Sequence, residues 1–138
     1  MYSEYFENWE VRSHFSKEFV SLWPCWLGKD NLHKLDEVTE IEWNKFNKWI
    51  SLIAERFTIK VVDCELEATS DFEHADLSTY QESMSKDRSL FSKFIIPKLG
   101  CVITEEWDYT YIIWHKNNEA LEALLPSIEN ARLEHFNE

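Results

Sequence analysis

Glycine is scarce in this chain of 138 residues, which contains only Gly28 and Gly100. This scarcity argues against the glycine-rich loops that hold phosphate groups through closely spaced backbone N–H groups. It also argues against a sandwich of many short strands, because such folds need glycine at many of their tight turns.

Paired cysteines and long apolar runs are missing as well. The three cysteines, Cys25, Cys64 and Cys101, are odd in number and show no C-x-x-C spacing, so we expect reduced, buried thiols. No apolar run approaches the roughly 20 residues that cross a bilayer. The first residues lack the basic and apolar regions of a signal peptide. The sequence therefore predicts a cytoplasmic protein without a membrane segment.

Basic residues are few, with 14 Lys and Arg against 26 Asp and Glu and a net charge of −12. The imbalance is sharpest between residues 61 and 85, where seven carboxylates occur without a lysine or arginine: Asp63, Glu65, Glu67, Asp71, Glu73, Asp76 and Glu82. A surface of this sign repels nucleic acid and anionic lipid and attracts basic proteins. We therefore expect a basic protein partner, and neither nucleic acid nor a membrane; improved solubility is the alternative explanation of the charge.

Apolar periodicity predicts helices first and a sheet afterwards. We expect a helix over residues 4–23, an irregular connection over 24–38, and a helix from the capping box of Thr39 and Glu42 to Phe57. The later elements are expected in the order strand, helix, strand, strand, helix, strand, over 58–66, 87–99, 101–105, 109–115, 117–128 and 132–136. The prediction is one α+β domain, 1–138, with a helical part (1–57) and an antiparallel sheet part (58–138) of ferredoxin-like β-α-β-β-α-β order.

Both faces of the predicted sheet need a cover. Along the strand over 109–115, Tyr111 and Ile113 alternate with Ile112 and Trp114, whereas two helices in this fold cover only one face. We expect the N-terminal helical pair to pack on the second face. A second subunit, and hence a homodimer, is the alternative.

Possible catalytic and metal sites are incomplete. His14 with Glu18, and the segment 71–76, lack the third and fourth ligands of a known metal-binding pattern. Cys25 and His33 show no protease pattern around them. We therefore expect neither a metal nor another cofactor and favour a protein that is not an enzyme.

A binding surface fits the residue pattern better. Trp107 stands among Glu105, Glu106 and Asp108, and an aromatic anchor within a ring of charge is typical of interaction hot spots. The expected partner surface comprises Asp63, Glu65, Glu67, Asp71, Glu73, Asp76, Tyr80, Glu105, Glu106, Trp107 and Asp108. The alternative is a small-ligand pocket formed by Trp43, Trp49, Tyr109, Tyr111 and Trp114.

The segment from Ile96 to Tyr111, IPKLGCVITEEWDYTY, resembles sequences in small uncharacterised bacterial accessory-gene proteins, including some carried on mobile cassettes. The resemblance implies a bacterial cytoplasmic protein of accessory, defensive or binding function, and it transfers no catalytic residue. The leading hypothesis is a non-enzymatic acidic protein that engages a basic partner, as an immunity protein or antitoxin-like inhibitor would. The second hypothesis is a small-ligand-binding ferredoxin-like domain with an aromatic cavity, as a monomer or a dimer, and its ligand binding is inferred by analogy with that fold.

Overall fold

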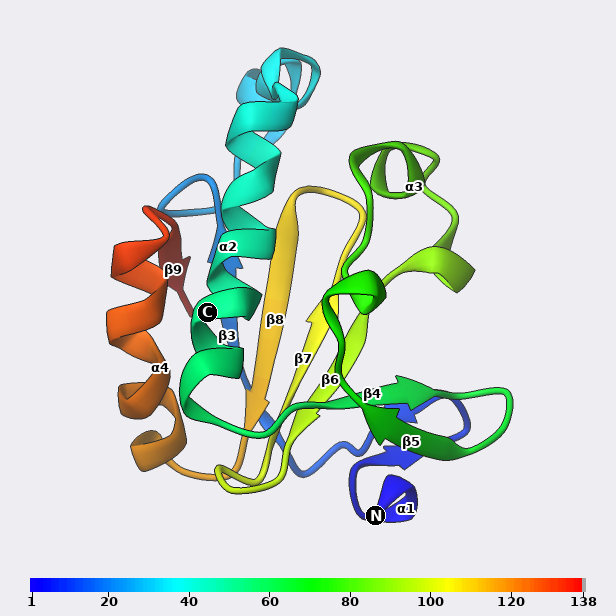
Figure 1. The fold of residues 1–138 in the computed structure, drawn as a ribbon. Coiled ribbons are helices and arrows are strands. Elements are labelled where there is room, and N and C mark those ends of the chain that lie inside the picture. The colour runs from blue at the N-terminus through cyan, green and yellow to red at the C-terminus, as the bar shows by residue number, and fades with distance from the viewer. Residues whose placement is uncertain (138) are drawn as a thin grey trace.

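A seven-stranded antiparallel sheet dominates the computed structural model, which describes residues 1–137 (Figure 1). The strand order is β5-β4-β6-β7-β8-β3-β9. The strands span Ser16–Ser21 (β3), Lys60–Asp63 (β4), Ala68–Asp71 (β5), Lys93–Ile96 (β6), Cys101–Glu105 (β7), Thr110–His115 (β8) and Glu134–Phe136 (β9). The fold is thus a mixed α+β fold, as predicted.

Two helices cover one face of this sheet. Helix α2 (Glu40–Arg56) begins at the predicted cap, where the Thr39 hydroxyl accepts a hydrogen bond from the Glu42 N–H at 3.4 Å. Helix α4 (Asn118–Asn130) begins where the Asn117 side chain accepts from the Ala120 N–H. The two helices pack on each other and on the sheet, and their apolar sides form the main core with β6, β7 and β8. The predicted helices in these two regions are confirmed.

The predicted helix over residues 4–23 is wrong. The region instead forms the short helix α1 (Tyr2–Tyr5), the hairpin strands β1 (Phe6–Glu7) and β2 (Glu10–Val11), and the strand β3. Asn8 and Trp9 have positive φ angles of 52° and 70°, which suit a two-residue hairpin turn and interrupt a helix. In β3, Phe19 lies opposite Ile112 and Val20 opposite Tyr111, so the strand is buried on both faces. Within the expected helical part, 1–57, the first helix is therefore wrong, while the second is present as α2.

The predicted helix over residues 87–99 is also wrong. A 3₁₀ turn, η3 (Arg88–Leu90), leads into β6, which pairs with β4 on one side and β7 on the other. Phe94 and Ile96 join the main core while Ile95 joins a second core on the opposite face. Because β6 replaces the helix, the β-α-β-β-α-β order is not confirmed. The β7–β8 hairpin appears where it was predicted.

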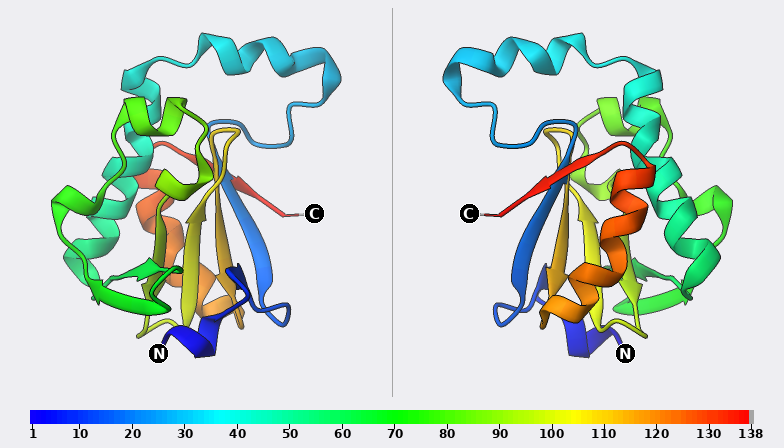
Figure 2. Two further views of the ribbon diagram at one scale, coloured as in Figure 1. Left: turned by 90° about the vertical axis from the view of Figure 1, so that its right-hand side faces the viewer. Right: turned by 90° about the vertical axis from the view of Figure 1, so that its left-hand side faces the viewer.

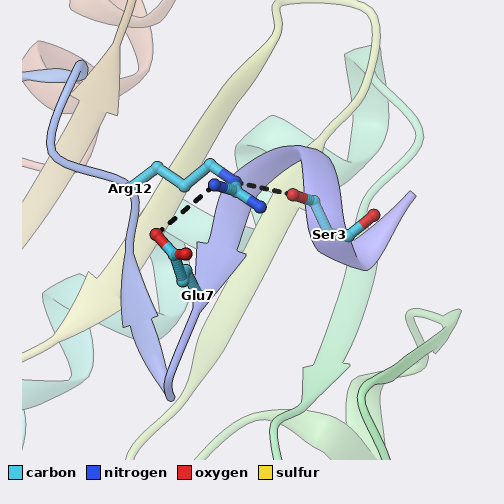
Figure 3. Close-up of polar contacts among 3 residues, drawn as sticks. All are labelled: Ser3, Glu7 and Arg12. Atoms are coloured by element: carbon cyan, nitrogen blue, oxygen red, sulfur yellow. Dashed lines mark hydrogen bonds and ion pairs between the residues drawn. The ribbon is translucent and has the colours of Figure 1, made fainter.

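The N-terminal residues cover part of the second sheet face. Tyr2, Tyr5, Phe6 and Phe15 pack there in a second core that includes Cys64, Ile95 and Val102. Figure 3 shows how this segment is held: the Arg12 guanidinium donates to the Ser3 carbonyl at 2.6 Å and to the Glu7 carboxylate at 3.4 Å. The cover is therefore a short helix and a hairpin, whereas the predicted helical pair does not exist and α2 lies on the other face.

Residues 22–38 leave the sheet as a separate segment, which we call the arm. It contains a 3₁₀ helix, η1 (Lys29–Glu37), that has no buried residue, and both views in Figure 2 show it extending outward beyond the ends of the strands. Gly28 precedes η1 with a φ of 69°, a conformation that strains other residues. Among residues 1–137, no helix is long and apolar enough to cross a membrane.

Candidate functional site

The seven carboxylates between residues 61 and 85 follow one edge of the sheet, and we call them the acidic edge. Asp63, Glu65 and Glu67 lie at the β4–β5 hairpin, and Asp71 ends β5. Glu73 and Asp76 flank the 3₁₀ turn η2 (His74–Asp76), while Glu82 lies in helix α3 (Tyr80–Met84). In Figure 1 this green segment runs along the side of the molecule opposite α4. All but the half-buried Glu82 are exposed.

Backbone N–H groups hold several of these carboxylates in place. Asp63 accepts from the N–H groups of Glu65 and Leu66 at 2.9 and 3.1 Å. Glu73 and Asp76 cap each other's backbone N–H group, and Glu82 accepts from the Thr79 N–H at 3.0 Å. Their orientations are therefore set by the local backbone, whereas their charges are not cancelled by it.

Few cations neutralise the acidic edge. Asp71 is paired with Lys60 across the β4–β5 ladder, and this lysine lowers the pKa of the Asp71 carboxyl by hydrogen bonding and by its charge. In residues 1–137, the carboxylates that form ion pairs are Glu4, Glu7, Glu18 and Asp71. Six of the seven carboxylates of the acidic edge therefore face solvent without an ion-pair partner in the described part of the chain.

The turn between β7 and β8 divides its three carboxylates between different environments. Glu105 is only 4% exposed, and it accepts hydrogen bonds from the hydroxyls of Ser78 and Ser83 at 2.9 and 2.7 Å and from the Ser92 N–H at 2.9 Å. The prediction that Glu105 belongs to a partner surface is therefore wrong. It fastens the segment 78–92 to the sheet instead.

Glu106 and Asp108 remain at the surface of this turn. Both are half-buried. Burial raises the pKa of the Glu106 carboxyl and the charge of Asp108 adds to the rise, while a hydrogen bond from the Thr104 hydroxyl at 3.2 Å opposes it. A carboxyl with a raised pKa therefore lies beside a second carboxyl, that of Asp108.

Trp107 is 48% exposed at the tip of the turn. Its carbonyl accepts a hydrogen bond from the Lys86 ammonium at 2.6 Å, and the same ammonium lies 4.4 Å from the centre of the Tyr109 ring. Burial lowers the pKa of Lys86, whereas the charges of Asp108 and Glu105 raise it. Lys86 thus connects the end of the acidic segment to the turn that carries Trp107.

A pocket of about 170 Å³ lies between the arm and this turn, and we call it the arm pocket. Trp23, Trp26 and Leu32 line it from the arm, and Trp107 and Asp108 line it from the turn. The other lining residues are Ser21, Cys25, Leu27, Gly28, Leu35 and Thr110. Three large apolar side chains with exposures of 44–51%, those of Trp26, Leu32 and Trp107, therefore meet at one site.

Sequence reasoning proposed Trp107 as an anchor, which stays a prediction, and it missed the arm pocket. The signal available was the apolar composition of Leu22, Trp23, Trp26 and Leu27 in a segment expected to be irregular. Tyr80, the other predicted anchor, is half-buried and packs its ring edge to face against Trp43 at 5.8 Å.

The five residues of the alternative ligand pocket are divided between the two faces of the sheet. Trp43, Trp49, Tyr109 and Tyr111 are buried core residues. The indole N–H groups of Trp43 and Trp49 donate to the hydroxyls of Ser83 and Ser127 at 3.1 and 3.0 Å. Trp114 lies half-buried on the other sheet face, where its indole donates to the Thr104 hydroxyl. Four of the five side chains are therefore packed in the main core, and Trp114 lies apart from them on the other face.

The cysteines and possible metal ligands are also separated. Cys64 and Cys101 are buried, but Cys25 is exposed at the arm pocket, so the expectation of three buried thiols is wrong. Burial raises the pKa of the Cys101 thiol to about 12. Within residues 1–137, no three His, Cys, Asp or Glu side chains come together as a possible metal site.

Comparisons with known proteins found no match for this chain among protein-family models, curated proteins or solved structures.

Proposed function

We propose that this chain is a non-enzymatic acidic binding protein that engages a basic protein partner, in the manner of an immunity protein or antitoxin-like inhibitor. The acidic edge steers the partner toward the molecule by its negative field, and Trp107 forms an apolar anchor beside it. A basic partner is favoured because the whole chain carries a charge of −12 and the acidic edge lies in its longest stretch without lysine or arginine.

The observation that carries this proposal is the combination of fixed orientation and unpaired charge at the acidic edge. Asp63, Glu73, Asp76 and Glu82 accept hydrogen bonds from nearby backbone N–H groups. Such ordered carboxylates lose little conformational entropy when a partner binds. Because their charges are not neutralised by described lysines or arginines, the field they create reaches into solvent.

The half-exposed Trp107 supports an interaction role for the neighbouring turn. A large aromatic side chain at the surface, beside half-buried Glu106 and Asp108, has the composition of an interface anchor with a charged surround. The arm adds Trp26 and Leu32 to the same site.

The test is the association rate with a partner isolated from the native host by affinity capture at low salt and elution with salt. We expect the association rate constant to fall about tenfold or more between low and physiological ionic strength, because screening removes the steering field. The variant Glu65→Gln/Glu67→Gln is expected to slow association at low salt. Neither side chain makes a hydrogen bond or ion pair in the described structure, so the variant changes charge without removing a structural contact.

The matched control is Glu119→Gln/Glu122→Gln on α4, which removes the same charge at the opposite edge of the sheet. The proposal requires a smaller effect from this control than from the acidic-edge variant. Equal effects of the two variants, or an association rate that does not respond to salt, would contradict it.

A further inference from the structure

The walls of the arm pocket have the composition of a site for an organic cation. Three tryptophans, Trp23, Trp26 and Trp107, contribute to the lining, and Asp108 is the acidic residue among the lining residues. Indole faces attract cations through their quadrupole, and the attraction is stronger for indole than for the rings of Tyr or Phe. Lys29 and Lys34 belong to the arm, but neither of them lines the pocket.

The same turn already holds one cation of the chain. Lys86 lies over the Tyr109 ring and donates to the Trp107 carbonyl. The charges of Asp108 and Glu105 act on this lysine, and the charge of Asp36 from the arm acts on Tyr109. Burial lowers the pKa of Lys86 overall, so the two carboxylates offset only part of the cost of burying its charge. The arm pocket shares Trp107 and the negatively charged Asp108 with this turn.

The size of the pocket restricts its occupant. Sites for whole small molecules usually measure roughly 300–1,000 Å³, whereas the arm pocket measures about 170 Å³. It therefore suits one side chain of a larger partner better than a complete metabolite. Among basic side chains, arginine fits these walls best, because its planar guanidinium stacks on aromatic rings and can form two hydrogen bonds to one carboxylate.

We propose that the arm pocket receives an arginine side chain of the basic partner, with the guanidinium between the tryptophans and its charge facing Asp108. This proposal rests on the proposed function, and it specifies the contact by which the partner is recognised. The acidic edge attracts any basic protein, whereas the arm pocket distinguishes arginine from lysine.

The test uses two peptides of equal charge, with acetylated and amidated ends, containing four Gly-Arg or four Gly-Lys repeats. Binding is measured by isothermal titration calorimetry, and the indole N–H signals are followed by NMR. We expect the arginine peptide to bind the native protein about threefold more tightly than the lysine peptide, in line with a cation–π contact at a solvent-accessible site. The signals of Trp26 and Trp107 are expected to shift with the arginine peptide.

Two variants locate this preference in the pocket. Trp107→Leu is expected to bring the ratio of the two affinities close to one. Asp108→Asn, which keeps the shape of the side chain, is expected to reduce the ratio without unfolding the protein. The matched control is Trp9→Leu, because Trp9 is an exposed tryptophan in the β1–β2 turn outside the pocket, and its loss should leave the ratio unchanged.

Equal affinity of the native protein for the two peptides would overturn the proposal, as would a Trp107→Leu variant that keeps the preference for arginine. These outcomes are distinct from a failure of the proposed function. The association of a partner could depend on salt and on Glu65 and Glu67 while Trp107→Leu leaves its affinity unchanged. That result would contradict the arginine site and leave the acidic binding function in place. Conversely, a preference for arginine combined with an association rate that does not depend on salt would support the arginine site and contradict the proposed acidic binding function.

Discussion

Single side chains in this molecule have roles that their position in the sequence does not reveal. Glu105 and Glu106 are neighbours in an acidic turn, but Glu105 is the last residue of β7, a strand whose residues are all buried, whereas Glu106 follows the strand and is half-buried. The buried carboxylate receives three donors from the segment 78–92. Acidic residues that are adjacent in a turn of the sequence therefore need not all lie at the surface.

Replacing Glu105 should destabilise the fold. Glu105→Ala removes the acceptor of three hydrogen bonds, two of them from the buried side chains of Ser78 and Ser83, so we expect a loss of about 3 kcal/mol in the free energy of unfolding. Glu105→Gln keeps an acceptor oxygen but loses the charge, and we expect roughly half that loss. Urea unfolding followed by circular dichroism measures both. The control Glu122→Gln, on the exposed side of α4, should change stability by less than about 0.5 kcal/mol. Equal stability of Glu105→Ala and the native protein would contradict this role.

The three thiols should differ sharply in reactivity. Cys25 is exposed, whereas Cys64 and Cys101 are buried and the pKa of Cys101 is raised to about 12. Because the thiolate is the reactive form, a disulfide reagent at pH 8 should modify one thiol quickly in the native state and three after unfolding in urea. Cys25→Ser should abolish the fast phase. Fast modification of two or three native thiols would show that the buried cysteines are accessible.

The helices and strands differ in how well they can be predicted from the sequence. Helix α2 was predictable because its cap and its apolar stripe agree, and the β7–β8 hairpin because two β-rich runs flank a short polar turn. Strands β3 and β6 were missed because both are central and buried on two faces, so the alternation that identifies a strand is lost. The arm pocket was missed because its walls come from residues 21–35 and 107–110, which only the sheet brings together.

The edge of the sheet offers a test of one cross-strand contact. Lys60 on β4 lowers the pKa of Asp71 on β5. The contribution of this pair to stability is therefore present at neutral pH and is lost as the pH falls through the lowered pKa of Asp71. Lys60→Gln should raise this pKa toward the usual aspartate range, as measured by NMR titration of the carboxyl carbon. Lys48→Gln, which removes an exposed lysine of α2, should leave the titration unchanged. An unaltered Asp71 titration in Lys60→Gln would disprove the coupling.

At the scale of the whole molecule, the negative charge and the aromatic core have opposite effects on the stability of the folded protein. The core buries large side chains on both faces of the sheet, including Trp43 and Trp49 on one face and Phe6 on the other. The charge of −12 repels itself in the folded state, where the carboxylates are closer together than in the unfolded chain. The acidic surface that favours a basic partner should therefore lower the stability of the free protein.

This opposition predicts that salt stabilises the free protein. Raising sodium chloride from 10 to 300 mM shortens the screening length from about 30 Å to less than 8 Å, which weakens repulsion among the exposed carboxylates. The midpoint of urea unfolding at pH 7 should therefore rise, and it should rise less in the Glu65→Gln/Glu67→Gln variant because that variant has less repulsion to screen. An uncharged solute at the same osmolality serves as the control for effects of water activity. A midpoint that stays constant or falls with salt would mean that attractive pairs, rather than repulsion, dominate the electrostatics of the folded chain, and the acidic edge would then not be a source of unbalanced charge.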